Sequence, residues 1–129
     1  MNRHLLNLAL AASLVAVGVP AQAAGFGAIY FDAEGGAQPT LGWSWRHTSS
    51  YAAEQRAAWE CARRAGRPCT HGSTYAGQCA AFVHGYASGA HRYNIFQSAF
   101  SGPAQAQGLA ACQGIGYSQC RVVGTACAH

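Results

Sequence analysis

The pattern of apolar and polar positions along the chain predicts a first unit of three strands and one helix. An apolar run at 26–31 and an alternating apolar–polar segment at 41–46 predict two strands that form a hairpin. Good helix formers from 51 to 65 predict a helix with Ser50 as its N-cap. Residues 69–75 follow as a weaker strand prediction. The first unit therefore has the order strand, strand, helix, strand.

The second half of the chain shows the same order of elements. The apolar run at 79–84 predicts a strand, and 91–100 predicts its hairpin partner. A shorter helix begins at Ser101 as its cap, and 120–125 predicts the last strand. Gly108 lies inside this helix and lowers its intrinsic stability by about 1 kcal/mol relative to alanine.

The two units also match position by position. Residues 101–120 repeat the pattern of residues 50–69 without insertion or deletion, 51 positions later, and both copies carry the spacing Cys-x7-Cys. A repeat that keeps its register across a helix and two cysteines indicates one supersecondary unit used twice. We therefore expect an α+β fold of two pseudo-symmetric, disulfide-stapled strand–strand–helix–strand repeats, with the helices packed on one side of an antiparallel sheet.

The composition makes disulfides part of this prediction. Half of the residues are apolar, but many of these are alanine, so the core is thin for a chain of this length. A thin core and six cysteines are typical of a disulfide framework in an exported protein. Six cysteines allow fifteen pairings, and the repeat favours those that join each helix end to the next strand. The expected pairs are Cys61–Cys69, Cys112–Cys120 and, from the two that remain, Cys79–Cys127.

A metal site is the alternative use of these cysteines. Its ligands would be Cys69, His71, Cys79 and His84. Zinc sites usually contain close ligand pairs such as Cys-x2-Cys, and the sequence has no such pair. Because an oxidising compartment favours disulfides over thiolate ligands, we expect no metal and no cofactor.

The first residues have the features of a targeting signal. Arg3 precedes an apolar run at 5–19, Pro20 ends the run, and small residues at 21–23 suit a cleavage site. The run is too short for a membrane span, which needs about 20 residues, so we expect no stable membrane anchor. The predicted organisation is a signal peptide at 1–23 and a single mature domain at 24–129, with repeat one at 25–78 and repeat two at 79–129.

Acid–base chemistry has few candidate residues. The chain has four acidic residues in all, and neither a Gly-x-Ser-x-Gly nor a His-Glu-x-x-His motif occurs. Asp32 and Glu34 resemble a glycosidase pair, but the glycines that follow them favour a turn. A small secreted hydrolase that uses a histidine such as His84 or His91 is therefore the alternative function, and no catalytic residue is assigned.

The remaining charged and aromatic residues favour a binding function. Three arginines at the end of the first helix match the helix dipole, and without a broader basic stripe they do not predict nucleic-acid binding. Trp43 and Trp45 share a strand face with Leu41, so we expect them in the core. Tyrosine and arginine are enriched at protein interfaces. The expected partner-binding residues, listed by position, are Tyr86, Arg92 and Tyr93.

Several segments follow one another in a characteristic order: GAIYFDAEGG, GWSW, the alanine-rich helix with Glu54, CAAFVHG, the second helix ending in AAC, and CRVVGTAC. In this order they resemble a family of exported bacterial proteins that is catalogued as domain of unknown function 4189. The resemblance covers essentially the whole mature chain. It implies secretion or a periplasmic location, it carries no established catalytic residues, and some members are associated with acting on, or protecting against, other proteins.

The sequence thus favours an exported, non-enzymatic domain that binds another protein, such as an envelope inhibitor, an immunity protein or a secreted effector. It does not define an oligomeric state. A hydrolase would show a concave pocket in which a histidine bonds Asp32 or a glutamate, because a catalytic histidine needs an orienting partner. A flat or protruding patch that contains Tyr86, Arg92 and Tyr93 would instead favour binding.

Overall fold

The computed structural model describes residues 25–129, and the predicted signal peptide lies outside these residues. None of the helices among the described residues is long and apolar enough to cross a bilayer. The predicted boundary between the repeats falls in the turn between the third and fourth strands. The elements are β1 (Phe26–Asp32), the short 3-10 helix η2 (Ala33–Gly35), β2 (Thr40–His47), α1 (Ser50–Ala65), β3 (His71–Ala76), β4 (Cys79–Ala87), β5 (Ala90–Ser98), α2 (Ser101–Gly114) and β6 (Ser118–Cys127).

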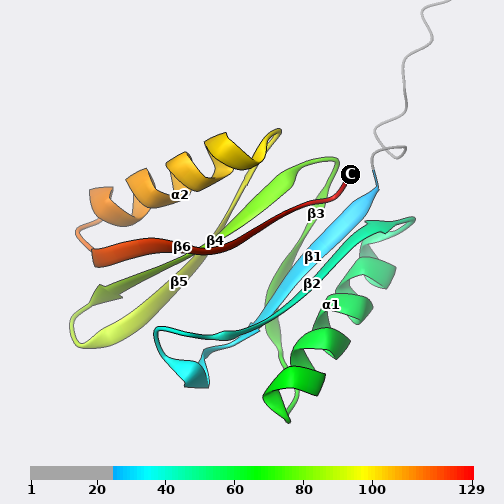
Figure 1. The fold of residues 1–129 in the computed structure, drawn as a ribbon, viewed down its shortest axis with the longest axis horizontal. Coiled ribbons are helices and arrows are strands. Elements are labelled where there is room, and N and C mark those ends of the chain that lie inside the picture. The colour runs from blue at the N-terminus through cyan, green and yellow to red at the C-terminus, as the bar shows by residue number, and fades with distance from the viewer. Residues whose placement is uncertain (1–24) are drawn as a thin grey trace, which may run out of the picture.

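Each unit forms its own antiparallel sheet of three strands. The strand orders are β2-β1-β3 and β5-β4-β6, so the first strand of each unit is central and the order of elements is the same in both. Helix α1 packs on the first sheet and α2 on the second. Figure 1 shows the two helices on opposite sides of the molecule, with the strands between them. The α+β fold and its repeats are therefore confirmed, whereas the expectation of one sheet with both helices on the same side is wrong.

Two sheets form because the central strands are apolar on both faces. In β1, Ala28 faces α1, while the next residue, Ile29, faces the second sheet. Ile29 belongs to a buried cluster with Phe82 of β4, and Phe31 meets Phe82 edge-on at a ring-centroid distance of 4.9 Å. A single sheet would leave these side chains in water. The inner faces therefore pack against each other, and the order of layers is helix, sheet, sheet, helix.

Small residues let each helix approach its sheet. The buried residues of the two helices correspond at the 51-residue offset: Ala53, Ala57 and Cys61 in α1, and Ala104, Gly108 and Cys112 in α2. A Cβ added at Gly108 would lie 2.5 Å from Cγ2 of Val83. The glycine that weakens α2 as an isolated helix is thus required by its contact with β4.

Three disulfides close the structure, and no cysteine is free in the described chain. Two of them join the last turn of a helix to the segment that follows it, each across eight residues, and the third joins β4 to the last residue of β6. These are the pairs that the repeat predicts: Cys61–Cys69, Cys112–Cys120 and Cys79–Cys127.

The ends of the helices differ in detail from the sequence prediction. Ser49, not Ser50, is the N-cap of α1, and its side chain accepts a hydrogen bond from the amide of Ala52 at 3.1 Å. Helix α2 begins after Phe100, which makes no side-chain capping bond, so Ser101 is its first residue rather than its cap. Both helices thus begin one residue before the position expected from the repeat.

The second hairpin is longer than the sequence indicated, since β4 continues to Ala87 and includes Gly85. A Cβ at Gly85 would lie 2.6 Å from Sγ of Cys112. Gly85 is therefore a position of close contact with the α2 disulfide rather than a turn residue, and the turn lies at Ser88 and Gly89, which both have positive φ.

Candidate functional site

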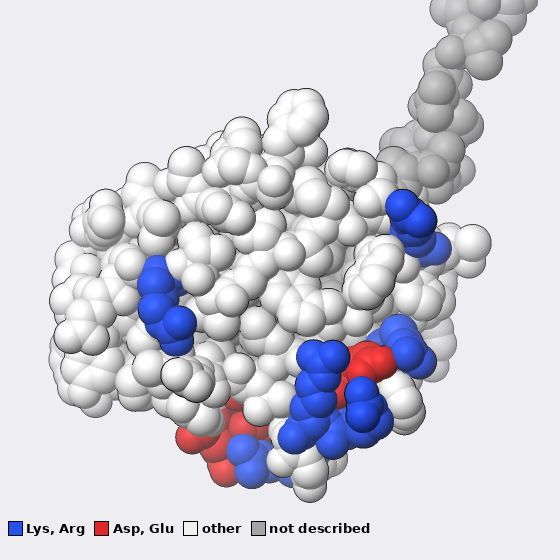
Figure 2. All heavy atoms as spheres, in the orientation of Figure 1, with Lys and Arg blue, Asp and Glu red and all other residues white. Residues whose placement is uncertain are grey.

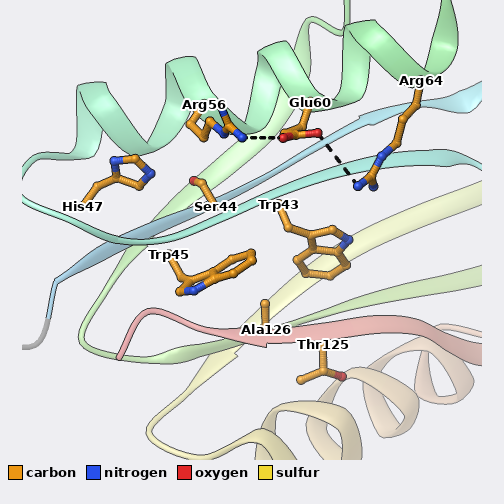
Figure 3. A pocket seen from close by; sticks show the side chains of 9 residues that line it. All are labelled: Trp43, Ser44, Trp45, His47, Arg56, Glu60, Arg64, Thr125 and Ala126. Atoms are coloured by element: carbon orange, nitrogen blue, oxygen red, sulfur yellow. Dashed lines mark hydrogen bonds and ion pairs between the residues drawn. The ribbon is translucent and has the colours of Figure 1, made fainter.

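A groove of about 510 Å³ lies between the first helix, the edge of the first sheet and the edge of the second sheet. Figure 3 shows that α1 forms one wall, while β2 and β6 form the floor and the other wall. The residues that line it are Trp43, Ser44, Trp45 and His47 of β2, Arg56, Glu60 and Arg64 of α1, and Thr125 and Ala126 of β6.

The alternation of β2 determines which side chains face this groove. Gly42 faces α1, where an added Cβ would collide with the backbone of Ala57. Ser44 also faces α1, and its hydroxyl donates a hydrogen bond to the carbonyl of Ala53 at 2.6 Å. Because the helix lies close to these small residues, the larger tryptophans of β2 project from the other face of the strand.

Trp43 and Trp45 differ in their burial. Trp43 is half-buried and packs against the core between the sheets, as expected. The expectation that Trp45 lies in the core is wrong, since 56% of its surface is exposed. A register shift in the pairing of β1 with β2 ends the regular ladder here, and Arg46 has φ 60°. This irregularity turns the end of β2 and leaves Trp45 on the groove.

The helix wall carries a cluster of charges around one carboxylate. Glu60 accepts hydrogen bonds from Arg56 at 2.7 Å and from Arg63 at 3.0 Å, and Arg64 approaches it to 3.9 Å. The hydrogen bond from Arg63 and the positive charges of all three arginines hold the pKa of the Glu60 carboxyl below its usual value. Three cations around one anion leave two net positive charges, and Figure 2 shows arginines gathered around a single acidic group.

An exposed tryptophan continues the cluster on the outer face of α1. The guanidinium carbons of Arg56 and Arg63 lie 4.8 and 5.5 Å from the ring centroid of Trp59, which is 54% exposed. The negative face of the ring attracts these cations, which stabilises the exposed position of the indole. We call this region the Trp–Arg surface, defined by Trp43, Trp45, Arg56, Trp59, Glu60, Arg63 and Arg64.

The structure does not bring the three predicted partner-binding residues into one patch. Tyr93 points into the core between the sheets, where its hydroxyl donates to the carbonyl of Gly36 at 2.6 Å. Adjacent residues of a strand face opposite sides, so the exposed Arg92 lies on the other face of the sheet. Tyr86 is half-buried against the ring of His91.

The histidines of the alternative hydrolase bond each other. Nε2 of His84 lies 2.8 Å from Nδ1 of His91, and His84 is only 3% exposed. Its other ring nitrogen has no hydrogen-bond partner among the described residues. Burial lowers the pKa of His84, and the positive charges of Arg121 and His91 lower it further.

The carboxylates accept hydrogen bonds from arginine and tyrosine side chains rather than from histidines. Asp32 accepts two hydrogen bonds of 2.7 Å from Arg67, which also contacts Glu34 at 3.0 Å. Glu54 accepts a hydrogen bond of 2.6 Å from the hydroxyl of Tyr30. Together with the arginine-bound Glu60, all four carboxylates therefore have partners that are not histidines.

The cysteines of the alternative metal site form disulfides. The sulfur of Cys69 is bonded to Cys61, and that of Cys79 to Cys127. The side chain of His129 lies near Cys79 and Cys127, but a thiolate is needed for ligation. The chain as described thus offers no thiolate ligand.

Sequence reasoning found the ion-pair series of α1 but missed the groove. The spacing of Arg56, Glu60 and Arg64 places them on one stripe of the helix. The missing information was the position of β6, which begins at Ser118, far from α1 in the chain, and completes the groove. The small residues Gly42 and Ser44 were the available signal, because they mark the helix-facing side of β2.

Comparison with known proteins gives one match. No curated protein and no solved structure matches the chain. The family model described as "Domain of unknown function (DUF4189)" matches residues 26–127, which include every strand and helix described above. This match covers most of the 129 residues, and the chain therefore belongs to the DUF4189 family.

Proposed function

We propose that this protein is an exported, non-enzymatic domain that binds another protein through the Trp–Arg surface. The observation that carries the proposal is the exposure of two tryptophans beside three arginines: Trp45 and Trp59 are 56% and 54% exposed. Tryptophan and arginine are the residues most enriched among those that dominate binding energy at protein interfaces. Exposed aromatic groups rimmed by polar residues mark interaction sites on soluble proteins.

The rigidity of the site supports this function. Arg56 holds Trp59 and also lines the groove, while the Cys61–Cys69 disulfide fixes the end of α1. A surface that is ordered before binding loses less conformational entropy when the partner arrives. Small, rigid domains of this kind suit an envelope inhibitor or immunity protein, or a secreted effector that occupies a target.

The disulfides support export. Three disulfides in a small domain are stable in an oxidising compartment such as the periplasm or the extracellular space. The histidine-based hydrolase has less support, because His84 and His91 bond each other and every carboxylate has another partner. The proposed function therefore uses the exposed tryptophans and arginines rather than the two histidines.

The proposal is tested with the protein purified with its disulfides intact and incubated with the envelope fraction of its own cells. Proteins captured by cross-linking are identified, produced separately, and their dissociation constants measured. We expect Trp45→Ala to weaken binding by at least tenfold, as for a residue at the centre of an interface. Phe100→Ala is the matched control, since Phe100 is a 69% exposed aromatic residue of the second unit.

The control should bind the partner as the unchanged protein does. Equal affinities for the unchanged protein and Trp45→Ala would contradict the proposed surface. Capture of no protein by the unchanged chain, from both the envelope fraction and the medium, would contradict the binding function itself.

A further inference from the structure

The two walls of the groove point to the kind of segment that it takes. We propose that the groove binds an extended, acidic segment of the partner, with carboxylates at Arg56 and Arg64 and apolar side chains against Trp43 and Trp45. This inference rests on the proposed function and deepens it. It is carried by unused hydrogen-bond donors, by charge, by the aromatic wall and by the free edges of two sheets.

The arginines of the groove have more donors than the chain uses. A guanidinium carries five N–H groups. Among the described residues, Arg56 donates to Glu60 at 2.7 Å, and Arg64 donates to the carbonyl of Leu41 at 3.0 Å. Figure 3 shows both side chains on the wall that faces the groove. Their remaining N–H groups can bind a carboxylate in the bidentate geometry that arginine favours.

The charge of this wall selects an anionic ligand. Among the described residues that line the groove, Glu60 alone is acidic, and its side chain is 14% exposed between three arginines. Arg56 and Arg64 exceed the one carboxylate of the lining by one positive charge, and Arg63 adds a second beside Glu60. These charges lie on one side of a concave site, where a local potential is stronger than on a flat surface. An acidic segment is therefore attracted, and a basic one is repelled.

The opposite wall selects apolar groups. Trp43 presents a half-buried indole, Trp45 an exposed one, and the methyl group of Ala126 lies beside them. An indole ring buries a large apolar area when a side chain of the ligand covers it. A ligand that fits both walls has carboxylates on one side and apolar groups on the other, which is the pattern of an alternating extended chain.

The positions of β2 and β6 favour a bound segment in the extended conformation. β2 and β6 are edge strands of their sheets, and both border the groove. The amide of Arg46 donates to the carbonyl of Ala128 at 3.0 Å, so the two edges meet at one end of the groove. Free strand edges bind extended segments in known modes of peptide recognition.

Glu60 acts against the ligand in this arrangement. Its carboxylate occupies the centre of the arginine cluster, so an incoming carboxylate meets a like charge. Glutamine at this position is neutral and keeps only one of the two acceptor oxygens, so one of the guanidinium donors that now bond Glu60, from Arg56 or from Arg63, becomes free. The inference therefore predicts that Glu60→Gln binds acidic segments more tightly than the unchanged protein.

The test uses three acetylated hexapeptides of alternating residues: glutamate and leucine, glutamine and leucine, and lysine and leucine. Binding is followed by tryptophan fluorescence and by calorimetry. We expect the acidic peptide to bind about tenfold more tightly than the glutamine peptide, with a preference that weakens as salt screens the charges. Arg56→Gln and Arg64→Gln should each reduce its affinity, Glu60→Gln should raise it, and the control Arg92→Gln, on the outer side of the other sheet, should change nothing.

Two outcomes would overturn the inference: equal binding of the acidic and glutamine peptides, or weaker binding of the acidic peptide by Glu60→Gln. Circular dichroism and a thermal midpoint for each variant exclude loss of the fold as the cause. The failure of this inference is separable from failure of the proposed function. A protein partner could fail to bind Trp45→Ala but still bind Arg56→Gln and Arg64→Gln. That result would support the proposed binding surface and refute the acidic ligand.

Discussion

The indole of Trp43 lies against Gly124, so a side chain from β2 of the first unit packs on β6 of the second. A Cβ added at Gly124 would lie 2.5 Å from Cζ2 of Trp43. The contact bridges the two sheets and fixes the indole that lines the groove. The interface between the units and the candidate binding site thus share one side chain.

Gly124→Ala should destabilise the protein by about 1–3 kcal/mol, because overpacking forces a buried group off its preferred position. Trp43 has to move, which should also change its fluorescence in the folded state. The free energy of unfolding is measured with guanidinium chloride. Gly102→Ala is the control, since Gly102 lies in the first turn of α2 with no atom near an added Cβ, and it should be neutral or slightly stabilising. Equal effects of the two substitutions would show that Trp43 does not depend on Gly124.

Gly108→Ala separates helix propensity from packing. Alanine in a helix interior is favoured over glycine by about 1 kcal/mol, but here its Cβ would lie 2.5 Å from Val83 and 3.0 Å from Phe96. Because both neighbours belong to the sheet under α2, we expect the clash to outweigh the propensity and the substitution to destabilise the fold by about 1–2 kcal/mol. Gly114→Ala, at the exposed end of the same helix, has no close neighbour and is the control. A more stable Gly108→Ala variant would mean that the helix can move away from the sheet.

The parts of the fold that the sequence predicted are those determined by local pattern. Helix positions follow from runs of helix formers, and two disulfides each join residues eight positions apart, so the repeat was sufficient to identify them. The division into two sheets depends on the pairing of β1 with β3, which are separated by a whole helix. Residues 71–76 carry only a weak strand pattern. Their pairing with β1 is a contact between segments far apart in the sequence, which the pattern of residues does not reveal.

The candidate site was less predictable, because alternation shows that a strand has two faces but not which face is covered. Leu41, Trp43 and Trp45 share a face by periodicity, yet the register shift near Arg46 leaves Trp45 exposed. Tyr93 was assigned to the surface from its position near a turn. Its hydroxyl instead reaches Gly36 in the other unit, a contact between residues 57 positions apart.

Stability should depend on pH through His84, which is buried. The pKa of His84 in the folded protein is below its ordinary value of 6.5, because burial and the charges of Arg121 and His91 disfavour the imidazolium. As the pH falls below about 6.5 the unfolded chain therefore binds a proton that the folded chain does not, and stability decreases; above this pH the contribution is complete. We expect the thermal midpoint to fall between pH 7.5 and pH 5.

His84→Phe should reduce this pH dependence. Phenylalanine cannot be protonated, and it keeps an aromatic ring against Tyr93, which contacts His84 at a ring-centroid distance of 5.5 Å. The carboxyls of Asp32 and Glu60 also have lowered pKa values, but their ordinary values of 3.8 and 4.5 place their effects at lower pH. A thermal midpoint that falls equally in both proteins between pH 7.5 and 5 would assign the effect to another group.

The Cys79–Cys127 disulfide should contribute more to stability than either of the other two, because it closes a much longer loop. In the chain-entropy account, a disulfide stabilises by restricting the unfolded chain, by about 2.5 kcal/mol for a separation of eight residues and about 4 kcal/mol for one of 48. The double variants Cys79→Ala/Cys127→Ala and Cys112→Ala/Cys120→Ala form a matched pair, since each removes one fully buried and one half-buried sulfur. The two double variants then lose similar packing contacts. The expected difference of about 1.5 kcal/mol between their free energies of unfolding therefore reports the difference in loop length. Equal losses would show that contacts in the folded state, rather than restriction of the unfolded chain, determine what these bonds contribute.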